Sequence, residues 1–547
     1  MPKISIGVSR QLDRPAQFRL ARDLGASVSH KLSCMRHISL PVEERCILLL
    51  SLFATGLAAQ TFTASNPAAL AARQWRTQHE RAIVDEFVTL LAIPNIAADQ
   101  ANIQRNAEAL AKMMEKRGIA SKLVTVPDAN SVVFGEIKTP GAKRTVVFYA
   151  HYDGQPLDPK EWATPPFTPT LRNKRFEKDG QVIQLPAPGI AFDPEWRLYA
   201  RGAADDKAPI VAMMAAIDAI RAAGLQTRSN IKFAFEGEEE AGSPNFEKIL
   251  AANRELFAGD VWLSCDGPVH QSGQQVLAFG QRGISTVDIT VYGPRGELHS
   301  GHYGNWAPNP AMMLVRLLAS MKDDNGRVLI EHFYDGIEPL NESEKRAVSA
   351  APDMGPELMQ ALWLGSTENA PLKLAELINL PSLNIRGMAS SRIGKQASNV
   401  IPSTATATID MRLVKGMKAN ETTDRFIEHV RKQGYFVVER EPDAEMRQSH
   451  PKVAWIVRGQ VENPFRVSMD LPVFQDVIRT VESARGPTVK MPTSGGTAPD
   501  AAEHALGIPG VLVPIGNHDN NQHSYNENLR LQNLWDGIEL MAALLAM

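Results

Sequence analysis

Residues 201–243 read RGAADDKAPIVAMMAAIDAIRAAGLQTRSNIKFAFEGEEEAGS, and this stretch decides the fold. An apolar helical pattern over residues 209–224 ends at a glycine, and a run rich in β-branched and aromatic residues follows over 230–237. A similar run, RTVVFYAH over 144–151, comes before it. Strand, helix and strand in this order are typical of a parallel sheet with crossover helices.

The same pattern of predicted strands and helices extends on both sides of this stretch. Further strands are expected at 131–137 (SVVFGEI) and 260–267 (DVWLSCDG), after helical spacing from about residue 75 to 118. The sequence therefore predicts an α/β fold, a mostly parallel sheet flanked by helices.

A second, smaller domain is expected inside the first, because the pattern of alternating strands and helices changes after residue 281. TATATIDMRL over 404–413 alternates apolar and polar residues, as a strand with one exposed face does. At 547 residues the chain also exceeds what one hydrophobic core normally serves. We expect a catalytic domain in two parts, 60–281 and 444–547, with an inserted α+β lid and dimerisation domain over 282–443.

The N-terminus differs in character, because the first 59 residues hold eight Lys/Arg and four Asp/Glu. Residues 46–59, CILLLSLFATGLAA, form an apolar run that ends in small residues, as a signal peptide does before cleavage. This run is too short to span a bilayer, so no membrane span is expected in the mature chain. We expect a signal peptide over 1–59, with Met35 as an alternative start, and a secreted or periplasmic protein.

Charge excludes one class of partner. The formal net charge is −3, and no run of Lys/Arg or basic aromatic stripe occurs, so nucleic acid is not an expected partner.

Acidic and imidazole side chains follow the predicted strands, where open parallel sheets place their ligand crevice. His151 and Asp153 end one strand, and a carboxylate two residues beyond a histidine can orient a metal-binding ring. Asp205 precedes a helix, where it could bridge two metals or simply cap the helix. The glutamates of FEGEEEAGS could bind metal and face a water, or form a solvated loop. Asp266 and His523 give no specific functional signal when taken alone.

The order of these motifs is more specific than any one of them. HYD at 151–153, RGAADDK at 201–207, EEAGS at 239–243, a strand-end aspartate at 266 and HSYNE at 523–527 together resemble the co-catalytic zinc peptidases. That family includes carboxypeptidase G, carnosinase-type dipeptidases and acetylornithine or succinyl-diaminopimelate deacylases. The resemblance implies one metal held by His151, Asp205 and Asp266, and a second held by Asp205, Glu240 and His523.

The resemblance also implies roles for other residues. Glu239 takes the position of the general base, and Asp153 that of the carboxylate supporting His151. His299, in GELHSGHYG, matches the family's lid histidine, which stabilises the oxyanion and often reaches the partner subunit's site in a homodimer. Arg412 falls where family dipeptidases bind the substrate carboxylate, a task suited to a guanidinium. The resemblance also places Asn399, Gly496 and Thr497 at further substrate-contact positions.

The expected function is hydrolysis of the amide bond of dipeptides or short peptides with two divalent metals. Zinc is expected, and the ligands also suit manganese or cobalt. An aspartate at position 266 goes, in this family, more often with dipeptidases than with carboxypeptidases and deacylases. An N-acyl amino acid deacylase or carboxypeptidase on the same scaffold is the alternative. A non-catalytic binding protein is a more distant alternative, because the sequence has a metal-ligating residue at every ligand position that the resemblance implies.

Overall fold

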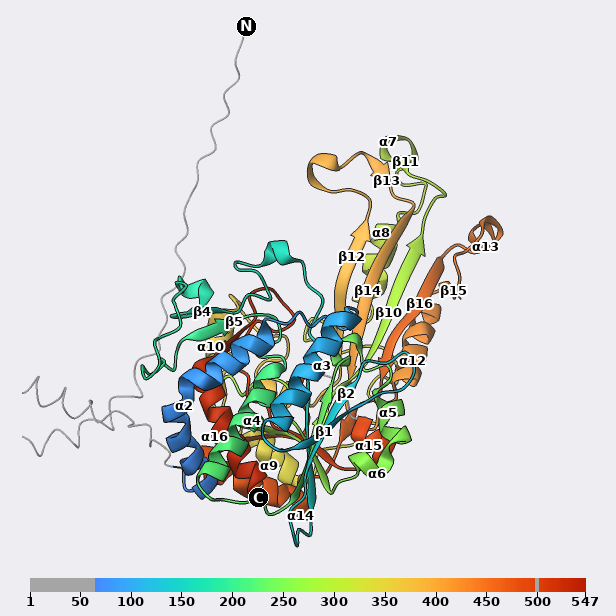
Figure 1. Ribbon diagram of the computed structural model, residues 1–547. Helices are drawn as coiled ribbons and strands as arrows, with labels where there is room; N and C mark the ends of the chain where they lie inside the picture. Colours follow the sequence, from blue (N-terminus) through green and yellow to red (C-terminus); the bar gives the residue numbers. More distant parts are fainter. Residues whose placement is uncertain (1–63, 497–500) are drawn as a thin grey trace, which may run out of the picture. The chain divides into compact units, whose positions relative to one another are not determined.

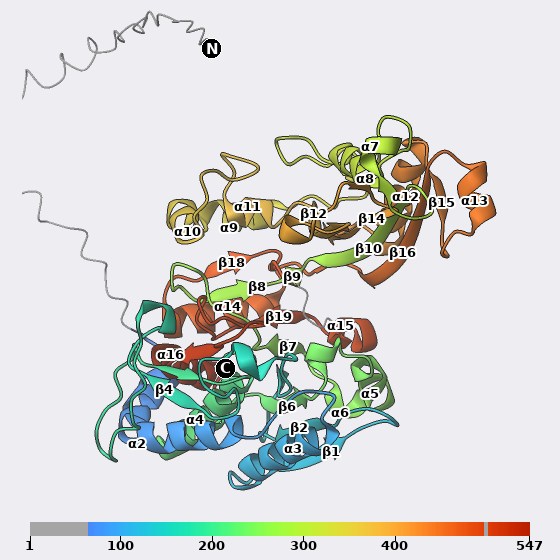
Figure 2. The same cartoon turned by 90° about the horizontal axis from the view of Figure 1, so that it is seen from above.

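A central strand, β3, organises the larger of two main sheets. The computed structural model describes residues 64–496 and 501–547; the predicted signal peptide and Thr497 lie outside them. The sheet has the order β1-β2-β6-β3-β7-β19-β8-β18. Figure 1 labels β1 and β2 at one edge, and Figure 2 follows the order from β1 to β18. Its strands are β1 (Ala120–Val124), β2 (Val132–Ile137), β3 (Thr145–His151), β6 (Asn230–Glu236), β7 (Val261–Ser264), β8 (Val276–Ala278), β18 (Val489–Met491) and β19 (Gly510–Leu512).

The middle of this sheet is parallel. β3 pairs in parallel with β6 and β7, and β19 pairs in parallel with β7. Antiparallel pairs join β1 to β2, β2 to β6 and β19 to β8. The predicted α/β fold with a mostly parallel sheet is therefore confirmed.

Alternate side chains of β3 enter different hydrophobic clusters, which explains its continuous apolar sequence. Val146 and Phe148 pack on one face, and Val147 and Tyr149 on the other. A strand between two helix layers needs apolar residues on both sides. The first face is covered by α2 (Pro67–Leu91), α3 (Gln100–Glu115), α4 (Lys207–Ala222) and α16 (Leu531–Leu545), and the second by α5 (Phe246–Ala252) and α15 (Ala501–Leu506).

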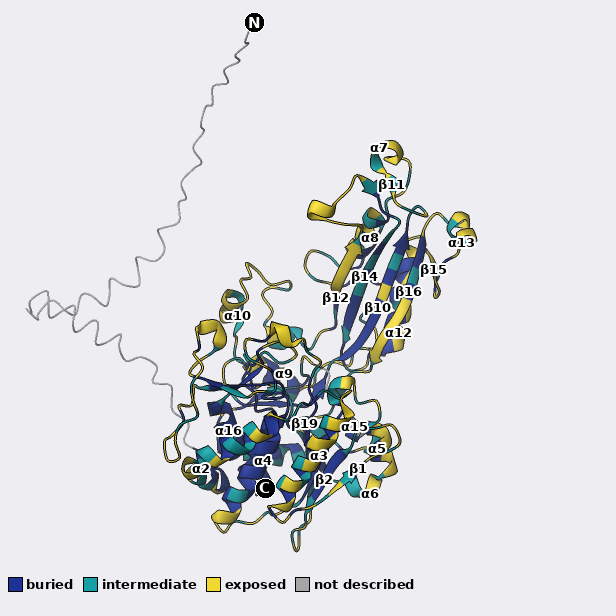
Figure 3. Cartoon of the chain, turned by 45° about the horizontal axis from the view of Figure 1, so that its top comes forward, coloured by how far each residue is buried: buried dark blue, intermediate teal, exposed yellow. Residues whose placement is uncertain are grey.

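The second main sheet has five strands in the order β12-β14-β10-β16-β15. Helices α8 (Pro310–Ala319) and α12 (Ala419–Lys432) share a hydrophobic cluster with it. The edge strand β12 is largely exposed, whereas β10 is largely buried (Figure 3). The strands are β10 (Gly283–Tyr292), β12 (Ser382–Ser390), β14 (Thr404–Leu413), β15 (Phe436–Val438) and β16 (Val453–Glu462).

The inserted domain ends later than the sequence predicts. β16 pairs with β10 inside the five-stranded sheet, so residues 453–462 belong to the insertion and not to the second part of the catalytic domain. Alternating residues in this strand match either sheet, and its pairing with β10 on one side and β15 on the other assigns it to the five-stranded sheet. The chain returns at β17 (Phe465–Arg466), which pairs with β9 (Gly280–Gln281). The two connections between the sheets therefore run side by side.

One part of the insertion returns to the larger sheet. Helix α9 (Glu342–Ala350) and the short α11 (Leu374–Leu377) lie beside β18 and β8 (Figure 2). Ala351 and Ala375 pack there against Val276 and Val489. Among the described residues, no helix is both long and apolar enough to cross a membrane.

Candidate metal centre

His151 is the last residue of β3, and Asp153, two residues later, lies beside one nitrogen of its ring. Both side chains are fully buried. Nδ1 of His151 lies 3.3 Å from the carbonyl oxygen of Asp153 and 3.5 Å from its carboxylate. The other ring nitrogen, Nε2, lies 3.1 Å from Oδ1 of Asp205. The ring thus has a supporting side and a side turned toward the candidate ligands, the arrangement found around metal-binding histidines.

Asp205 presents its two oxygens to two different histidines. It lies in the loop before α4, with Oδ1 toward His151 and Oδ2 3.2 Å from Nε2 of His523. His523 comes from the other end of the chain, in the loop before β20 (Asn528–Arg530). A carboxylate placed in this way can share its oxygens between two cations.

The two candidate glutamates follow β6 in a single turn of 3-10 helix, Glu239–Ala241. Asp153 fixes this turn, since its two oxygens accept the backbone N–H groups of Glu239 at 3.1 Å and Glu240 at 2.9 Å. Oε2 of Glu239 lies 3.8 Å from Nε2 of His151, and Oε2 of Glu240 lies 3.4 Å from Nε2 of His523. Asp153 therefore joins the end of β3 to the glutamate turn.

Within the described residues, the five predicted ligands fall into two groups that share Asp205. His151, Asp205 and Asp266 form one group, and Asp205, Glu240 and His523 form the other. In each group the ligand atoms all lie within 4.8 Å of one another. Imidazole nitrogens and carboxylate oxygens are the donors that zinc and related divalent ions accept.

The charges of this cluster also suit cations. Burial, together with the charge of Asp205, raises the pKa of Asp266 to about 6 and that of Glu240 to about 7. Its contact with Asp205 raises the pKa of His523 to about 9. A protonated His523 thus supplies positive charge between the carboxylates. Bound divalent cations would take over this role and displace those protons.

Two supporting residues were missed in the sequence. Glu527 is fully buried, and its carboxylate accepts the N–H groups of Gly202, Ala204 and Asp205 at 2.9 to 3.1 Å. It also pairs with Arg201 at 2.8 Å. Gln155 donates to Glu240 at 2.6 Å. The motif HSYNE contained Glu527, but a glutamate in a polar loop gave no signal of burial.

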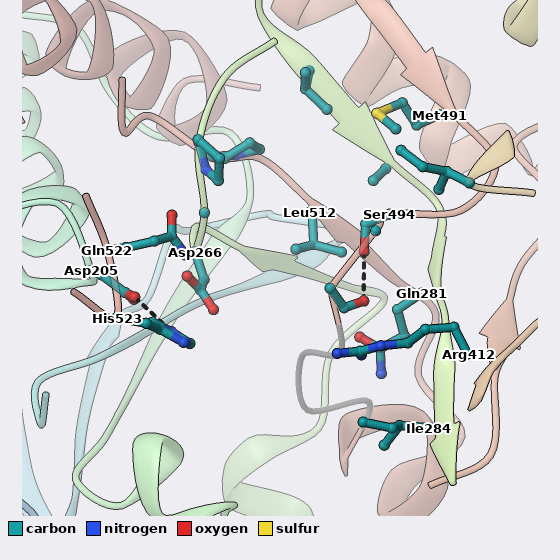
Figure 4. Close-up of a pocket in the computed structure, with 18 of the residues that line it drawn as sticks. Asp205, Asp266, Gln281, Ile284, Arg412, Met491, Ser494, Leu512, Gln522 and His523 are labelled. Atoms are coloured by element: carbon teal, nitrogen blue, oxygen red, sulfur yellow. Dashed lines mark hydrogen bonds and ion pairs between the residues drawn. The ribbon is translucent and has the colours of Figure 1, made fainter. Parts of the chain in front are cut away.

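A cavity of about 1480 Å³ opens over this centre. Arg412, on β14, extends into it from the side opposite Asp205, Asp266 and His523 (Figure 4). Its Nε lies 3.6 Å from a carboxylate oxygen of Asp410. Gly496 also lines the cavity. The structure thus brings two of the predicted substrate-contact residues into the same cavity as the candidate metal ligands.

His299 and Asn399 are not among the residues that line this cavity. They lie together at the tip of the inserted domain, where β11 (Leu298–His299) pairs with β13 (Val400–Ile401), and the N–H of Ser300 donates to the carbonyl of Asn399 (Figure 1). His299 is exposed, and its Nδ1 accepts the N–H of Gly301 at 3.0 Å. Within one chain, the predicted oxyanion histidine therefore stays away from the centre.

Comparison with known proteins identifies the class to which this fold and centre belong. The model of the family described as "Peptidase family M20/M25/M40" matches residues 147–547, so the chain belongs to this peptidase family. The predicted resemblance and the assignment as a metallopeptidase are confirmed.

Relatives and solved structures agree with this assignment. The Cys-Gly metallodipeptidase dug1 of Schizosaccharomyces pombe is 28% identical over 495 residues, which cover 83% of this chain and 94% of that protein. The human Beta-Ala-His dipeptidase is 27% identical over 440 residues, covering 76% of this chain and 78% of that protein. The structure of an M20 family metallo-carboxypeptidase from Sulfolobus solfataricus aligns with a TM-score of 0.67 at 26% identity, covering 85% of this chain and 98% of that one.

Proposed function

We propose that the chain is a dipeptidase that hydrolyses the amide bond of small peptides with two divalent metal ions, zinc in the first place. The observation that carries the proposal is the position of Asp205, whose two oxygens face His151 and His523. Each histidine lies in its own group of three ligands. One carboxylate shared by two ligand groups is suited to two ions close together.

Glu239 is the proposed general base. The pair of ions, when bound, lowers the pKa of water and polarises the scissile carbonyl. Glu239 then takes the proton of the attacking water on a carboxylate oxygen and delivers it to the leaving nitrogen. Asp153 holds the backbone of Glu239, so the base keeps its position next to His151. Gln155 holds Glu240 in its place as a ligand.

Arg412 supports a substrate with a free carboxylate. Its guanidinium can hold a carboxylate at two points, at the side of the cavity opposite the metal ligands. Asp266 and the two dipeptidase relatives favour dipeptides. The second candidate function is that of a carboxypeptidase or N-acyl amino acid deacylase. It is supported by the structural relative that is named as a metallo-carboxypeptidase.

His299 is proposed to act on the site of a second copy of the chain. Its exposed position at the tip of the insertion favours contact with a partner over contact with its own cavity. Export is proposed from the sequence alone, on the apolar run at 46–59. N-terminal sequencing of the protein recovered outside the cytoplasm tests it, and an intact N-terminus in a cytoplasmic form would contradict it.

The test of the proposed function compares wild type with Glu239→Gln. Both are expected to bind about two metals per chain by elemental analysis, because glutamine removes the base and no ligand. Hydrolysis of a dipeptide panel is expected to fall by about a hundred- to ten-thousand-fold in the variant. Hydrolysis of N-acetyl amino acids alone would change the substrate class, and absence of stoichiometric metal in wild type would overturn the mechanism.

A further inference from the structure

A row of apolar residues crosses the end of the larger sheet inside the cavity. Leu512 on β19 is the register partner of Ala278 on β8, and Ala278 is the partner of Met491 on β18. Register partners on neighbouring strands point to the same face of a sheet. All three residues line the cavity. With neighbouring strands about 4.8 Å apart, the row is about 10 Å long, enough for one large side chain.

The row connects the metal ligands to the opposite side of the cavity. At one end, Leu512 is in register with Ser264, two residues before Asp266. At the other end, β18 leads into the loop 494–496, which also lines the cavity. In Figure 4, Leu512 lies between Asp266 and Ser494, and Arg412 reaches in from the far side.

The insertion adds a fourth apolar residue, Ile378, just after α11. It lines the cavity and lies over the loop, so a β-carbon on Gly495 would be 3.8 Å from its Cδ1. The segment that carries it is held to the sheet, because Ala375 packs with Val276 and Val489 in one cluster. We call Leu512, Ala278, Met491 and Ile378 the apolar shelf.

We propose that the apolar shelf binds the side chain of the substrate's C-terminal residue and selects dipeptides that end in a large apolar residue, such as leucine, methionine or phenylalanine. This inference rests on the proposed function. With the scissile carbonyl at the metal ligands and the terminal carboxylate at Arg412, the residue between them faces the shelf. None of the four shelf residues carries a polar side-chain group that could pair with a charged substrate side chain.

The expected preference is substantial. One methylene in a hydrophobic pocket changes kcat/KM by about tenfold or more, so Ala-Leu is expected to exceed Ala-Gly by at least about tenfold. Ala-Asp is expected to be worse than Ala-Gly, because its carboxylate would lose water without gaining a partner on the shelf.

The experiment measures kcat/KM of the metal-loaded wild type for Ala-Leu, Ala-Met, Ala-Gly and Ala-Asp. A preference for Ala-Leu and Ala-Met supports the shelf. Equal rates for all four, or a preference for glycine or aspartate, overturn it while leaving the dipeptidase function in place. No hydrolysis of any of the four, under conditions where metal is bound, would count against the proposed function itself.

Variants separate the shelf from general stability. Ile378→Asn is expected to reduce the ratio of the Ala-Leu to the Ala-Gly rate by about tenfold. Leu380→Asn is its matched control, since Leu380 is 42% exposed, follows two residues later and does not line the cavity. Met491→Gln is a second shelf variant of similar size. Unchanged ratios in both shelf variants, or the same loss in Leu380→Asn, overturn the proposal.

Discussion

Glu527 shows how one side chain can support the candidate metal centre from outside its two ligand groups. It holds three backbone N–H groups of the loop that carries Asp205, and it lies four residues after His523. One carboxylate therefore fixes the bridging ligand relative to a ligand from the far end of the chain. Supporting hydrogen bonds of this kind orient ligands and tune their affinity.

Glu527→Gln is expected to weaken metal binding by about ten- to a hundred-fold, because the loop of Asp205 loses a charged acceptor. It also leaves Arg201 buried without its counter-charge, which costs about 3 to 5 kcal/mol of unfolding free energy. Metal titration and urea unfolding measure the two effects.

Glu195→Gln is the control for this variant, because Glu195 pairs with Arg530 at 3.4 Å while 65% exposed. Its loss should cost about 1 kcal/mol or less. Equal behaviour of the two variants would refute the role assigned to Glu527.

Sequence patterns found the residues whose chemistry is unusual for their place, and missed those whose burial decides their role. His151 stands out because it ends an apolar strand, and Asp266 because it follows one by two residues. Glu527 and Gln155 stand in polar loops, and only the folded chain shows what they contact. The positions of His299 and Asn399 could not follow from spacing either, because both lie on the tip of a separate domain.

Helices α2 and α4 are joined by a buried amine. Lys207, the first residue of α4, donates to the carbonyl oxygens of Leu90 at 3.1 Å and Ile93 at 3.3 Å, at the end of α2 and just beyond it. Burial lowers the pKa of this lysine to about 7. The contact sets the start of α4 directly after the loop that carries Asp205.

Lys207→Met is expected to lower the free energy of unfolding by about 1 to 3 kcal/mol, because two buried carbonyls lose their donor. The pKa is lower in the folded chain than in the unfolded chain, so between about pH 7 and pH 10 the unfolded chain binds more protons. Wild-type stability therefore gains over the variant as the pH rises through this window. Urea unfolding at several pH values checks the sign, and a gap that closes with rising pH would contradict it.

At this scale the sequence was informative where a pattern had one structural solution. The strand expected at 230–237 forms β6, and the helix expected at 209–224 forms α4, because an apolar run bounded by turn residues has little alternative. β16 was assigned to the wrong domain, since its longer pairing is with β10, which lies more than 150 residues away. No element was predicted for the segment from α9 to α11, and it supplies part of the cavity wall.

For the whole molecule, the proposed use of a second copy makes activity depend on assembly. A homodimer in which His299 crosses to the partner has sites that each draw on two chains. Such sites can be complemented between variants, whereas sites confined to one chain cannot.

Co-expression of Glu239→Gln with His299→Ala tests this point. In a mixed dimer, one site combines an intact Glu239 with an intact His299 from the other chain. Random pairing restores about a quarter of wild-type activity, while each variant alone stays nearly silent. Sedimentation analysis should find dimers in all preparations. If both variants are silent alone, dimers with no recovered activity would place His299 in the site of its own chain. A fully active His299→Ala variant would place His299 outside the reaction.

The sharing of Asp205 between His151 and His523 has a consequence for the order of events in the cell. A chain still emerging from the ribosome contains His151 long before His523 has been made. Until His523 has been made and folded into place, such a chain offers the complete group His151, Asp205 and Asp266 but only part of the second group. Under the proposed mechanism, loading of the second ligand group is therefore a late step, set by the synthesis of the C-terminal part of the chain.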